Sequence, residues 1–143
     1  MYDDVLLPVD GSDGTGAALA HAESLGTTYG ATVHVLHVAD TNRDSVTTLA
    51  AGNTVDVLSE KGTELVEEVS AALDPAVSRR TEVLQGDPHD TIVDYANEYG
   101  IDLIVMATHG RRGLERFLLG SVTDRVVRTA DVPVLTVRLD EAA

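Results

Sequence analysis

The sequence predicts an α/β fold: a doubly wound parallel sheet of five strands in the order 3-2-1-4-5, with helices on both faces. The first observation is that short apolar or alternating runs, typical of strands, take turns with longer segments of helical periodicity. The second is that nearly all connections are short, and right-handed crossovers between parallel strands then leave few topologies. A chain of 143 residues with 43% hydrophobic residues is expected to form one domain over residues 1–143.

The first strand and helix are expected within residues 5–30. Residues 5–9 (VLLPV) are a short apolar run typical of a buried parallel strand, and Asp10-Gly11-Ser12 marks the turn after it. Gly30 is the expected end of the helix that follows. The apolar residues on one face of this helix are expected to be buried: Ala18, Ala22, Leu25 and Tyr29.

Residues 32–73 predict a strand, a loop and a second helix. Residues 32–38 (TVHVLHV) have the composition of a buried strand. Residues 39–53 have no clear period and contain several turn-forming residues, which predicts a loop. An apolar stripe then predicts a helix at residues 55–73. Asp74-Pro75 should end it, because the residue before a proline disfavours the helical conformation.

The second half of the chain predicts three more strands and two more helices. Residues 77–84 alternate but carry many polar side chains, which indicates an edge strand. Asp87 as N-cap, Pro88 as first helical residue and Asp90 in the first turn predict a helix that ends at Gly100. The remaining elements are expected at residues 103–106 (strand), 120–129 (helix) and 134–137 (strand).

The segment from Ile101 to Val122 has the pattern of a phosphate-binding site. Its apolar run breaks into Ala107-Thr108-His109-Gly110, nine residues follow, and Gly120-Ser121 opens a helix. A buried strand that leads through a glycine loop to a helix N-terminus presents free backbone N–H groups and the positive end of the helix dipole. Three arginines within the loop add positive charge: Arg111, Arg112 and Arg116.

The other half of the site is expected at the end of the first strand. In a doubly wound sheet the ligand lies beyond the carboxyl ends of the strands, where the strand order reverses. If strands one and four flank this point, Asp10 faces residues 107–110, and residues 38–40 lie alongside. A carboxylate at that place can accept hydrogen bonds from a ribose diol. The alternative is that Asp10 is only a turn residue in Asp-Gly-Ser.

Composition narrows the class of partner. The formal charge of −14 and the pI of about 4.4 argue against non-specific binding to nucleic acid or to an anionic membrane. The chain has no cysteine, no apolar run long enough to span a bilayer and an acidic N-terminus, which predicts a cytoplasmic protein. Lys61 is the single lysine against nine arginines. This pattern is typical of a high-salt organism, with an ordinary acidic protein as the alternative.

Several blocks of the sequence resemble the universal stress protein family over essentially the full length. They are VLLPVDGS, HVLHVAD, GDPHDTIVDYANEYGIDLIVMATHG and RRGLERFLLGSVTDRVVRTADVPVLTV. The resemblance implies a Rossmann-like fold similar to the adenine-nucleotide α-hydrolases. It also implies the nucleotide-binding pattern G-x2-G-x9-G-[ST]. Gly110, Gly120 and Ser121 match this pattern, whereas Ala107 replaces its first glycine, and its methyl lies where the ligand would approach.

The same resemblance implies the roles of individual residues toward ATP or another adenine nucleotide. Asp10 would bind the ribose hydroxyls, and the backbone of Val38 would meet the adenine. Arg111 or Arg112 would pair with the outer phosphates, or would be solvated loop residues. Mg2+ or Mn2+ would come with the triphosphate. The implied nucleotide-binding residues are Pro8, Val9, Asp10, Val38, Met106, Ala107, Gly110, Arg111, Arg112, Gly113, Gly120, Ser121 and Val122.

The sequence indicates no catalytic residue and no metal site of the protein itself. The five histidines are scattered, and His34 and His37 are expected to point to opposite faces of one strand. Ser121 has no visible base partner, which argues against nucleophilic catalysis. Any ATP hydrolysis would be slow, with Thr123 or Asp124 left open as a water-positioning residue.

Three functions are compared on this basis. The first is an ATP-binding regulatory or stress-response protein. The second is a dimeric interaction module that binds no nucleotide, which Ala107 favours. The third is an enzyme that acts on adenylated or phosphorylated small molecules, supported by fold alone.

The last strand predicts self-association. Residues 134–137 (VLTV) should form the sheet edge opposite the third strand, yet the segment is apolar and has little protection. We expect a twofold homodimer through antiparallel pairing of these strands, which the family resemblance also implies. The alternative is an edge covered by the C-terminal tail.

Overall fold

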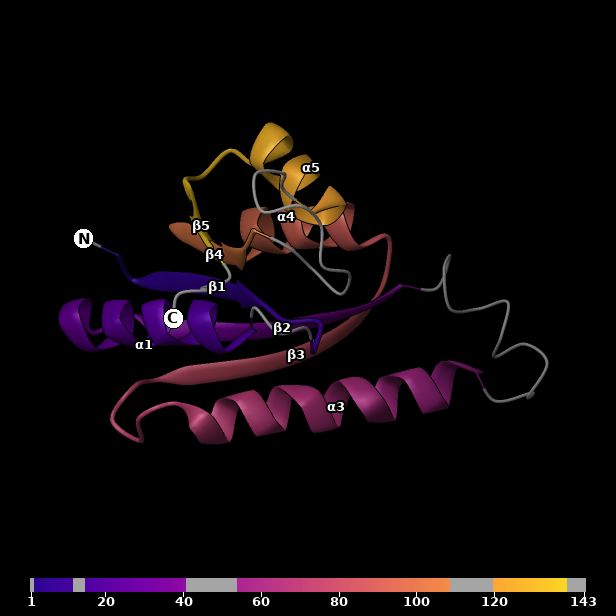
Figure 1. The fold of residues 1–143 in the computed structure, drawn as a ribbon, viewed down its shortest axis with the longest axis horizontal. Coiled ribbons are helices and arrows are strands. Elements are labelled where there is room, and N and C mark those ends of the chain that lie inside the picture. The colour runs from indigo at the N-terminus through magenta and orange to yellow at the C-terminus, as the bar shows by residue number, and fades with distance from the viewer. Residues whose placement is uncertain (1, 12–14, 41–53, 109–119, 139–143) are drawn as a thin grey trace.

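The fold places five parallel strands in one sheet of order β3-β2-β1-β4-β5, as predicted (Figure 1). The computed structural model describes residues 2–11, 15–40, 54–108 and 120–138. The elements are β1 (Asp4–Pro8), α1 (Thr15–Tyr29), β2 (Thr32–Asp40), α3 (Thr54–Ala72), β3 (Arg79–Gly86), α4 (Pro88–Glu98), β4 (Leu103–Ala107), α5 (Ser121–Thr129) and β5 (Val134–Val137).

The strand register places the reversal of strand order at the centre of the sheet. On one side of β1 lies β2, with Pro8 opposite Leu36. On its other side lies β4, with Leu6 opposite Ile104, although about a hundred residues of chain separate the two. The chain therefore winds outward from β1 to β3 and then from β4 to β5, and the switch point falls between β1 and β4.

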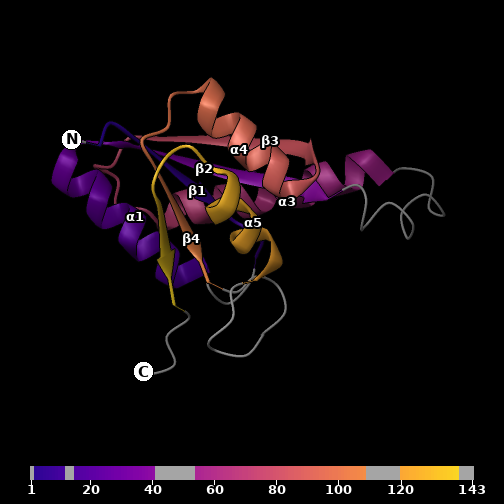
Figure 2. The same cartoon turned by 90° about the horizontal axis from the view of Figure 1, so that it is seen from above.

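Two helices cover each face of the sheet. In Figures 1 and 2, α1 and α3 lie on one side and α4 and α5 on the other. Alternation along β1 sends Val5 and Leu7 into the core under α1 and α3, and Leu6 into the core under α4 and α5. All three side chains are fully buried. Burial on both faces explains why these strands are continuous apolar runs and not alternating ones.

Two strands, β2 and β3, differ most from their predicted bounds, while β1 is shifted by one residue to Asp4–Pro8 and β4 continues one residue further to Ala107. β2 continues through Ala39 and Asp40, which were predicted as loop, because β3 pairs with it as far as Asp40 opposite Gly86. β3 begins two residues later than expected, because the Val77 amide donates to the Asp74 carbonyl in a turn. The rest of the predicted loop, residues 41–53, lies outside the described residues.

The expectation that Tyr29 is buried was wrong. Its side chain is 43% exposed, and its ring meets that of Tyr2 edge-on at 5.2 Å. The last turn of α1 approaches the sheet through Gly26 instead. A Cβ at Gly26 would lie only 2.8 Å from Cγ1 of Val77 and 3.3 Å from Cγ2 of Val33. The close contact of helix and sheet is therefore made by a glycine, which a pattern of large apolar residues does not reveal.

Candidate functional site

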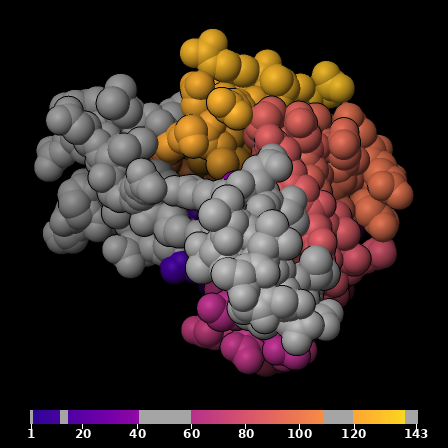
Figure 3. Space-filling model, turned by 90° about the vertical axis from the view of Figure 1, so that its right-hand side faces the viewer, coloured from indigo at the N-terminus to yellow at the C-terminus, as the bar shows by residue number. Residues whose placement is uncertain are grey.

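The carboxyl ends of β1 and β4 lie side by side at the switch point, where the ligand was predicted. Figure 3 views this end of the molecule, with α5 in yellow, β3 and α4 in pink to orange, and α3 in magenta. Asp10 follows β1 directly and is half-buried. Gly11 turns the chain there with a φ of 80°, a conformation that favours glycine. The Asp-Gly pair thus places a carboxylate just beyond the sheet.

The backbone of β2 extends past the end of β1. The Val9 amide donates to the Leu36 carbonyl at 2.8 Å, so the polar groups of Leu36 point toward β1. Backbone polar groups of alternate residues in a strand point to the same side. Those of Val38 therefore also point toward β1, beyond the last paired residue, Pro8. Val38 can offer an N–H and a C=O to an adenine edge at this place.

The apolar residues expected to line the pocket lie on two different faces. Met106 and Val38 belong to the core under α4 and α5, as does Leu6, two residues before Pro8. Val9 is 5% exposed and packs in the opposite core, under α1 and α3. The side chain of Val9 thus lies in the core, and its carbonyl is 2.9 Å from Nδ1 of His37.

The N-terminus of α5 is directed at the end of β4. Gly120 is the N-cap, and the first helical hydrogen bond runs from the Asp124 amide to the Gly120 carbonyl at 2.8 Å. The amides of Ser121 and Val122 precede this bond and are the kind of donor that binds phosphate. Gly120 has a φ of −63°, which any residue adopts. The backbone conformation at this position therefore does not require glycine.

Two hydrogen bonds hold α5 against β4, and the sequence analysis did not predict them. The Gly120 amide donates to the Thr108 carbonyl at 2.5 Å. The hydroxyl of Thr123, a buried side chain, donates to the Ala107 carbonyl at 2.9 Å. The sequence gives one indication of the second bond. Thr123 is a polar residue three positions before the buried Val126, and it therefore lies on the inner face of the helix. With Thr123 engaged in this way and Asp124 bonded to Arg128 at 3.0 Å, both residues once considered for positioning water hold structural contacts.

Replacing Thr123 with valine is expected to lower the free energy of unfolding by about 1–3 kcal/mol, because it removes a buried hydroxyl and leaves the half-buried Ala107 carbonyl without this partner. Thr129→Val is the matched control, since its hydroxyl also donates to a backbone carbonyl, at 2.7 Å, but from an exposed position. Urea unfolding measures both. Equal losses for the two variants would show that Thr123 does not fasten α5 to β4.

Four predicted phosphate-site residues lie outside the described residues: Gly110, Arg111, Arg112 and Gly113. Their contacts with a nucleotide stay predictions. The part of the site that the structure describes comprises the ends of β1 and β2 on one side, and the end of β4 with the start of α5 on the other. These parts supply the carboxylate of Asp10, the backbone edge of Val38 and a helix N-terminus, a set that suits a sugar, a base and a phosphate respectively.

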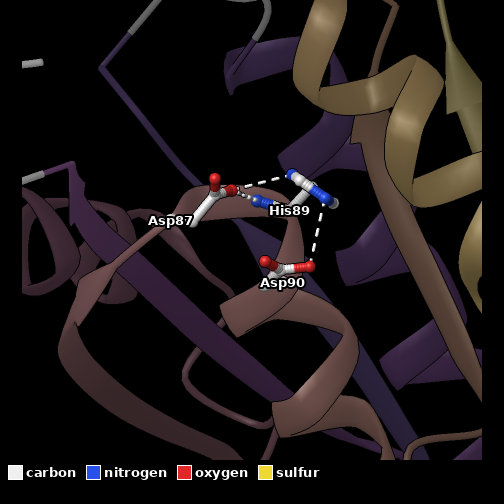
Figure 4. A group of neighbouring side chains, drawn as sticks. All are labelled: Asp87, His89 and Asp90. Carbon is white, nitrogen blue, oxygen red and sulfur yellow. Dashed lines mark hydrogen bonds and ion pairs between the residues drawn. The ribbon is translucent and has the colours of Figure 1, made fainter. Parts of the chain in front are cut away.

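Within the described ranges, one group of potential metal ligands comes together: Asp87, His89 and Asp90 at the start of α4 (Figure 4). Nδ1 of His89 lies 2.7 Å from Asp87, and Nε2 lies 3.1 Å from Asp90. Asp87 also caps the helix, as predicted, accepting from the His89 amide at 3.2 Å. The position of both carboxylates at the start of α4 is explained by N-capping and by the helix dipole, which favours acids in the first turn. The group was not predicted, because its single histidine lies between two acids and the spacing of the histidines alone does not reveal it.

The histidines of β2 point to opposite faces, as predicted. His34 contacts Tyr95 of α4, with Nδ1 2.8 Å from the phenol oxygen. His37 lies under α3, so that a Cβ on Gly62 would come within 2.7 Å of its ring. Glycine at this position lets α3 approach β2.

Burial raises the pKa of Tyr95 from its ordinary value of 10.0 to about 12. Between these values the unfolded chain releases the phenol proton and the folded chain keeps it. The stability from this group is therefore fully present below about pH 10 and is lost as the pH rises through 12, about 2–3 kcal/mol in all. Urea unfolding above pH 9 should show this slope in the wild type and in Tyr29→Phe, whose phenol is exposed, but not in Tyr95→Phe. The same slope in Tyr95→Phe would assign it to other groups.

Comparison with known proteins gives a consistent result. The model of the family described as "Universal stress protein family" matches residues 1–138. Universal stress protein MJ0531 of Methanocaldococcus jannaschii is 37% identical over 142 residues, covering 96% of this chain and 83% of the relative. Universal stress protein YxiE of Bacillus subtilis is 30% identical over 151 residues, covering 96% and 100%.

Solved structures extend the likeness to the fold. The structure of MJ0577, described as a hypothetical protein, has a TM-score of 0.88 at 30% identity and covers 99% of both chains. A universal stress protein in complex with cAMP has a TM-score of 0.66 at 22% identity, covering 97% of this chain and 98% of its own. One from Archaeoglobus fulgidus in complex with dAMP has a TM-score of 0.60 at 23% identity, covering 95% and 98%. These last two show a shared fold.

Proposed function

This chain belongs to the universal stress protein family, and on that premise we propose that it binds an adenine nucleotide, ATP foremost, as a regulatory protein of a stress response. The observation that carries the proposal is the start of α5, which the bond from the Gly120 amide to the Thr108 carbonyl holds at the end of β4, the strand next to β1 and Asp10. Helix N-termini of this kind hold phosphate groups. The complexes of two proteins of the same fold with cAMP and dAMP support the choice of adenine.

The proposed binding mode assigns one part of the nucleotide to each element. Asp10 accepts hydrogen bonds from the ribose hydroxyls, and the backbone of Val38 meets the adenine edge. Pro8 and Met106 line the pocket, whereas Val9, which was expected there too, has its side chain in the opposite core and its amide and carbonyl engaged with Leu36 and His37. The phosphates meet the α5 start and the loop before it: Ala107, Gly110, Arg111, Arg112, Gly113, Gly120, Ser121 and Val122. Mg2+ or Mn2+ comes with the triphosphate and is held mainly by phosphate oxygens.

Equilibrium dialysis of the purified protein against labelled ATP tests this proposal. We expect saturable binding that unlabelled ATP, AMP or cAMP displaces, with GTP as the control of equal charge. An adenine edge read by one N–H and one C=O discriminates against guanine, whose edge presents the opposite pattern of donors and acceptors. Absence of binding, or equal displacement by GTP, would contradict the adenine site.

A dimeric interaction module that binds no nucleotide is the second candidate. Ala107 favours it, because this residue replaces the first glycine of the nucleotide-binding pattern and adds a methyl at the end of β4. Slow ATP hydrolysis would be a variant of the first candidate.

Within the described residues no helix is long and apolar enough to cross a membrane. We further propose a cytoplasmic location, without nucleic-acid partners, and a single domain over residues 1–143.

A twofold homodimer through β5 is part of the proposal. β5 is an edge of the described sheet, and Leu135 on it is 36% exposed. Leu135→Lys should shift the protein from dimer to monomer, because antiparallel pairing would place the two charges close together. Light scattering after size exclusion measures the mass. Val127→Lys is the control, at an exposed apolar residue on α5. A wild-type monomer, or an unchanged dimer in Leu135→Lys, would contradict this interface.

A further inference from the structure

Three hydrogen-bonded titratable side chains, two of them buried and the third half-buried, link the sheet to α4, away from the proposed nucleotide site. His34 of β2 is 4% exposed and Tyr95 of α4 is 2% exposed. Nδ1 of His34 lies 2.8 Å from the phenol oxygen of Tyr95, and Nε2 lies 2.9 Å from Oδ1 of Asp4 on β1. The imidazole thus joins three elements that are distant in sequence.

The arrangement resembles a catalytic relay, but it cannot act as one. An imidazole between a hydroxyl and a carboxylate can activate the hydroxyl as a nucleophile. The hydroxyl of Tyr95 is buried, so no substrate reaches it. Any functional effect of these three linked side chains therefore has to act through the contact between α4 and the sheet.

The direction of each hydrogen bond follows from the carboxylate of Asp4, which can only accept, so Nε2 of His34 carries a hydrogen and Nδ1 of the neutral ring is left as an acceptor. Burial raises the pKa of Tyr95 to about 12, so its hydroxyl keeps its hydrogen at neutral pH. Nδ1 of neutral His34 accepts this hydrogen, and its Nε2–H donates to Asp4. Every polar atom of the imidazole is then satisfied in one tautomer.

A second proton on His34 disturbs only one end of this chain. The imidazolium still donates to Asp4 through Nε2, and the opposite charges attract. At Nδ1, however, two hydrogens now meet, because the new N–H and the Tyr95 hydroxyl both donate. The phenol must turn its hydrogen away and accept instead. Among the described residues its hydrogen-bonding partner is His34 alone.

The surroundings of the pair decide where the phenol hydrogen can go. The charged or titratable groups that face Tyr95 are Arg80 and Glu82 from β3, Tyr99 from α4 and Asp4 from β1. Arg80 has no acceptor and lies over the ring of Tyr99 at 4.6 Å. Asp102 is occupied by the amides of Asp3 and Asp4, at 2.8 and 2.9 Å. Glu82 and Asp4 are the carboxylates that face Tyr95, and the phenol is hydrogen-bonded to neither of them in the structure. A phenol hydrogen turned away from His34 therefore has no acceptor among the described residues as α4 now packs, and a buried donor left unpaired weakens the contact of α4 with the sheet.

We propose that His34 is a proton-operated latch: its protonation reverses the hydrogen bond to Tyr95 and loosens α4 from the sheet. Histidine gains its charge between about pH 8 and 5, so acidification of the protein's surroundings is the signal. The latch needs no nucleotide and is independent of the proposed function. The apolar contacts of Ile92 and Ala96 keep α4 in place, so the helix loosens without unfolding.

Nuclear magnetic resonance of the wild-type protein tests the latch. Long-range 1H–15N spectra at about pH 8 should show His34 as the Nε2–H tautomer. Over the pH range in which the spectra show His34 gaining its second proton, amide exchange in α4, corrected for its intrinsic pH dependence, should accelerate roughly tenfold relative to α1. An Nδ1–H tautomer, a neutral His34 throughout, or unchanged α4 exchange after protonation would each overturn the proposal.

Two variants separate the latch from general acid effects. His34→Gln removes the titration and should abolish the pH dependence of α4 exchange, whereas His21→Gln should keep it. His21 is exposed on α1 and is the matched control. Equal pH dependence in the two folded variants would assign the effect to other groups. Should His34→Gln not fold, the wild-type spectra decide alone.

Discussion

Gly120→Val is expected to abolish nucleotide binding while the chain stays folded. A valine side chain at the N-cap of α5 would occupy the space through which phosphate reaches the amides of Ser121 and Val122. Loss of the phosphate contacts should weaken ATP binding at least about 100-fold, since each charge-assisted hydrogen bond contributes about 1.5–3 kcal/mol. Titration calorimetry measures the affinity, and urea unfolding confirms the fold.

Gly16→Val is the matched control for this variant. Gly16 is exposed in α1, and a Cβ at this position meets nothing within 4 Å. Its affinity for ATP should equal that of the wild type. Asp10→Ala tests the same site at a different part of the nucleotide, because it removes the carboxylate proposed to bind the ribose. Asp131→Ala removes an exposed acid and is its control. ATP binding of wild-type strength by both Gly120→Val and Asp10→Ala would place the nucleotide elsewhere.

The largest loss of stability is expected for Ile104→Ala. Ile104 is fully buried in β4, with Leu6 opposite it on β1 and Val134 on β5. It packs in the core under α4 and α5, where the surrounding side chains cannot close the cavity completely. The free energy of unfolding should fall by about 3–5 kcal/mol. This is a large part of the total stability of a typical domain, about 5–15 kcal/mol.

Val127→Ala is the control for this loss. Val127 is 43% exposed on α5, and alanine has the higher helix propensity, so its stability should change by less than about 0.5 kcal/mol. Chemical denaturation of both variants gives the comparison. A loss below about 1 kcal/mol for Ile104→Ala would mean that β4 is not at the centre of a close-packed sheet.

The fold could be predicted well because its signals are local. Buried strands such as VLLPV are continuous apolar runs, and the cap at Asp87-Pro88 is a short-range pattern that the structure reproduces. The family resemblance is confirmed, and the strand order with it. Tyr29 was placed wrongly because helical periodicity identifies a face but not where that face leaves the sheet.

The site could be predicted only in outline. Asp10 follows β1, and Gly120 is bonded to Thr108 at the end of the neighbouring strand β4, whereas their binding to a common ligand stays a prediction. The hydrogen bond from Thr123 to Ala107 depends on how α5 packs against β4. This is a long-range contact that no sequence motif indicates. The side chain of Val9 lies in the opposite core for a similar reason, since one residue of register reverses the face. The high-salt origin suggested by the acidity stays a prediction.

A crystal structure of the protein with ATP and Mg2+ tests the central claim most directly. We predict the nucleotide beyond the carboxyl ends of β1 and β4, with its ribose at Asp10, its adenine at the backbone of Val38 and its phosphates at the start of α5. ATP bound at any other place, or an empty switch point at saturating ATP, would contradict the account.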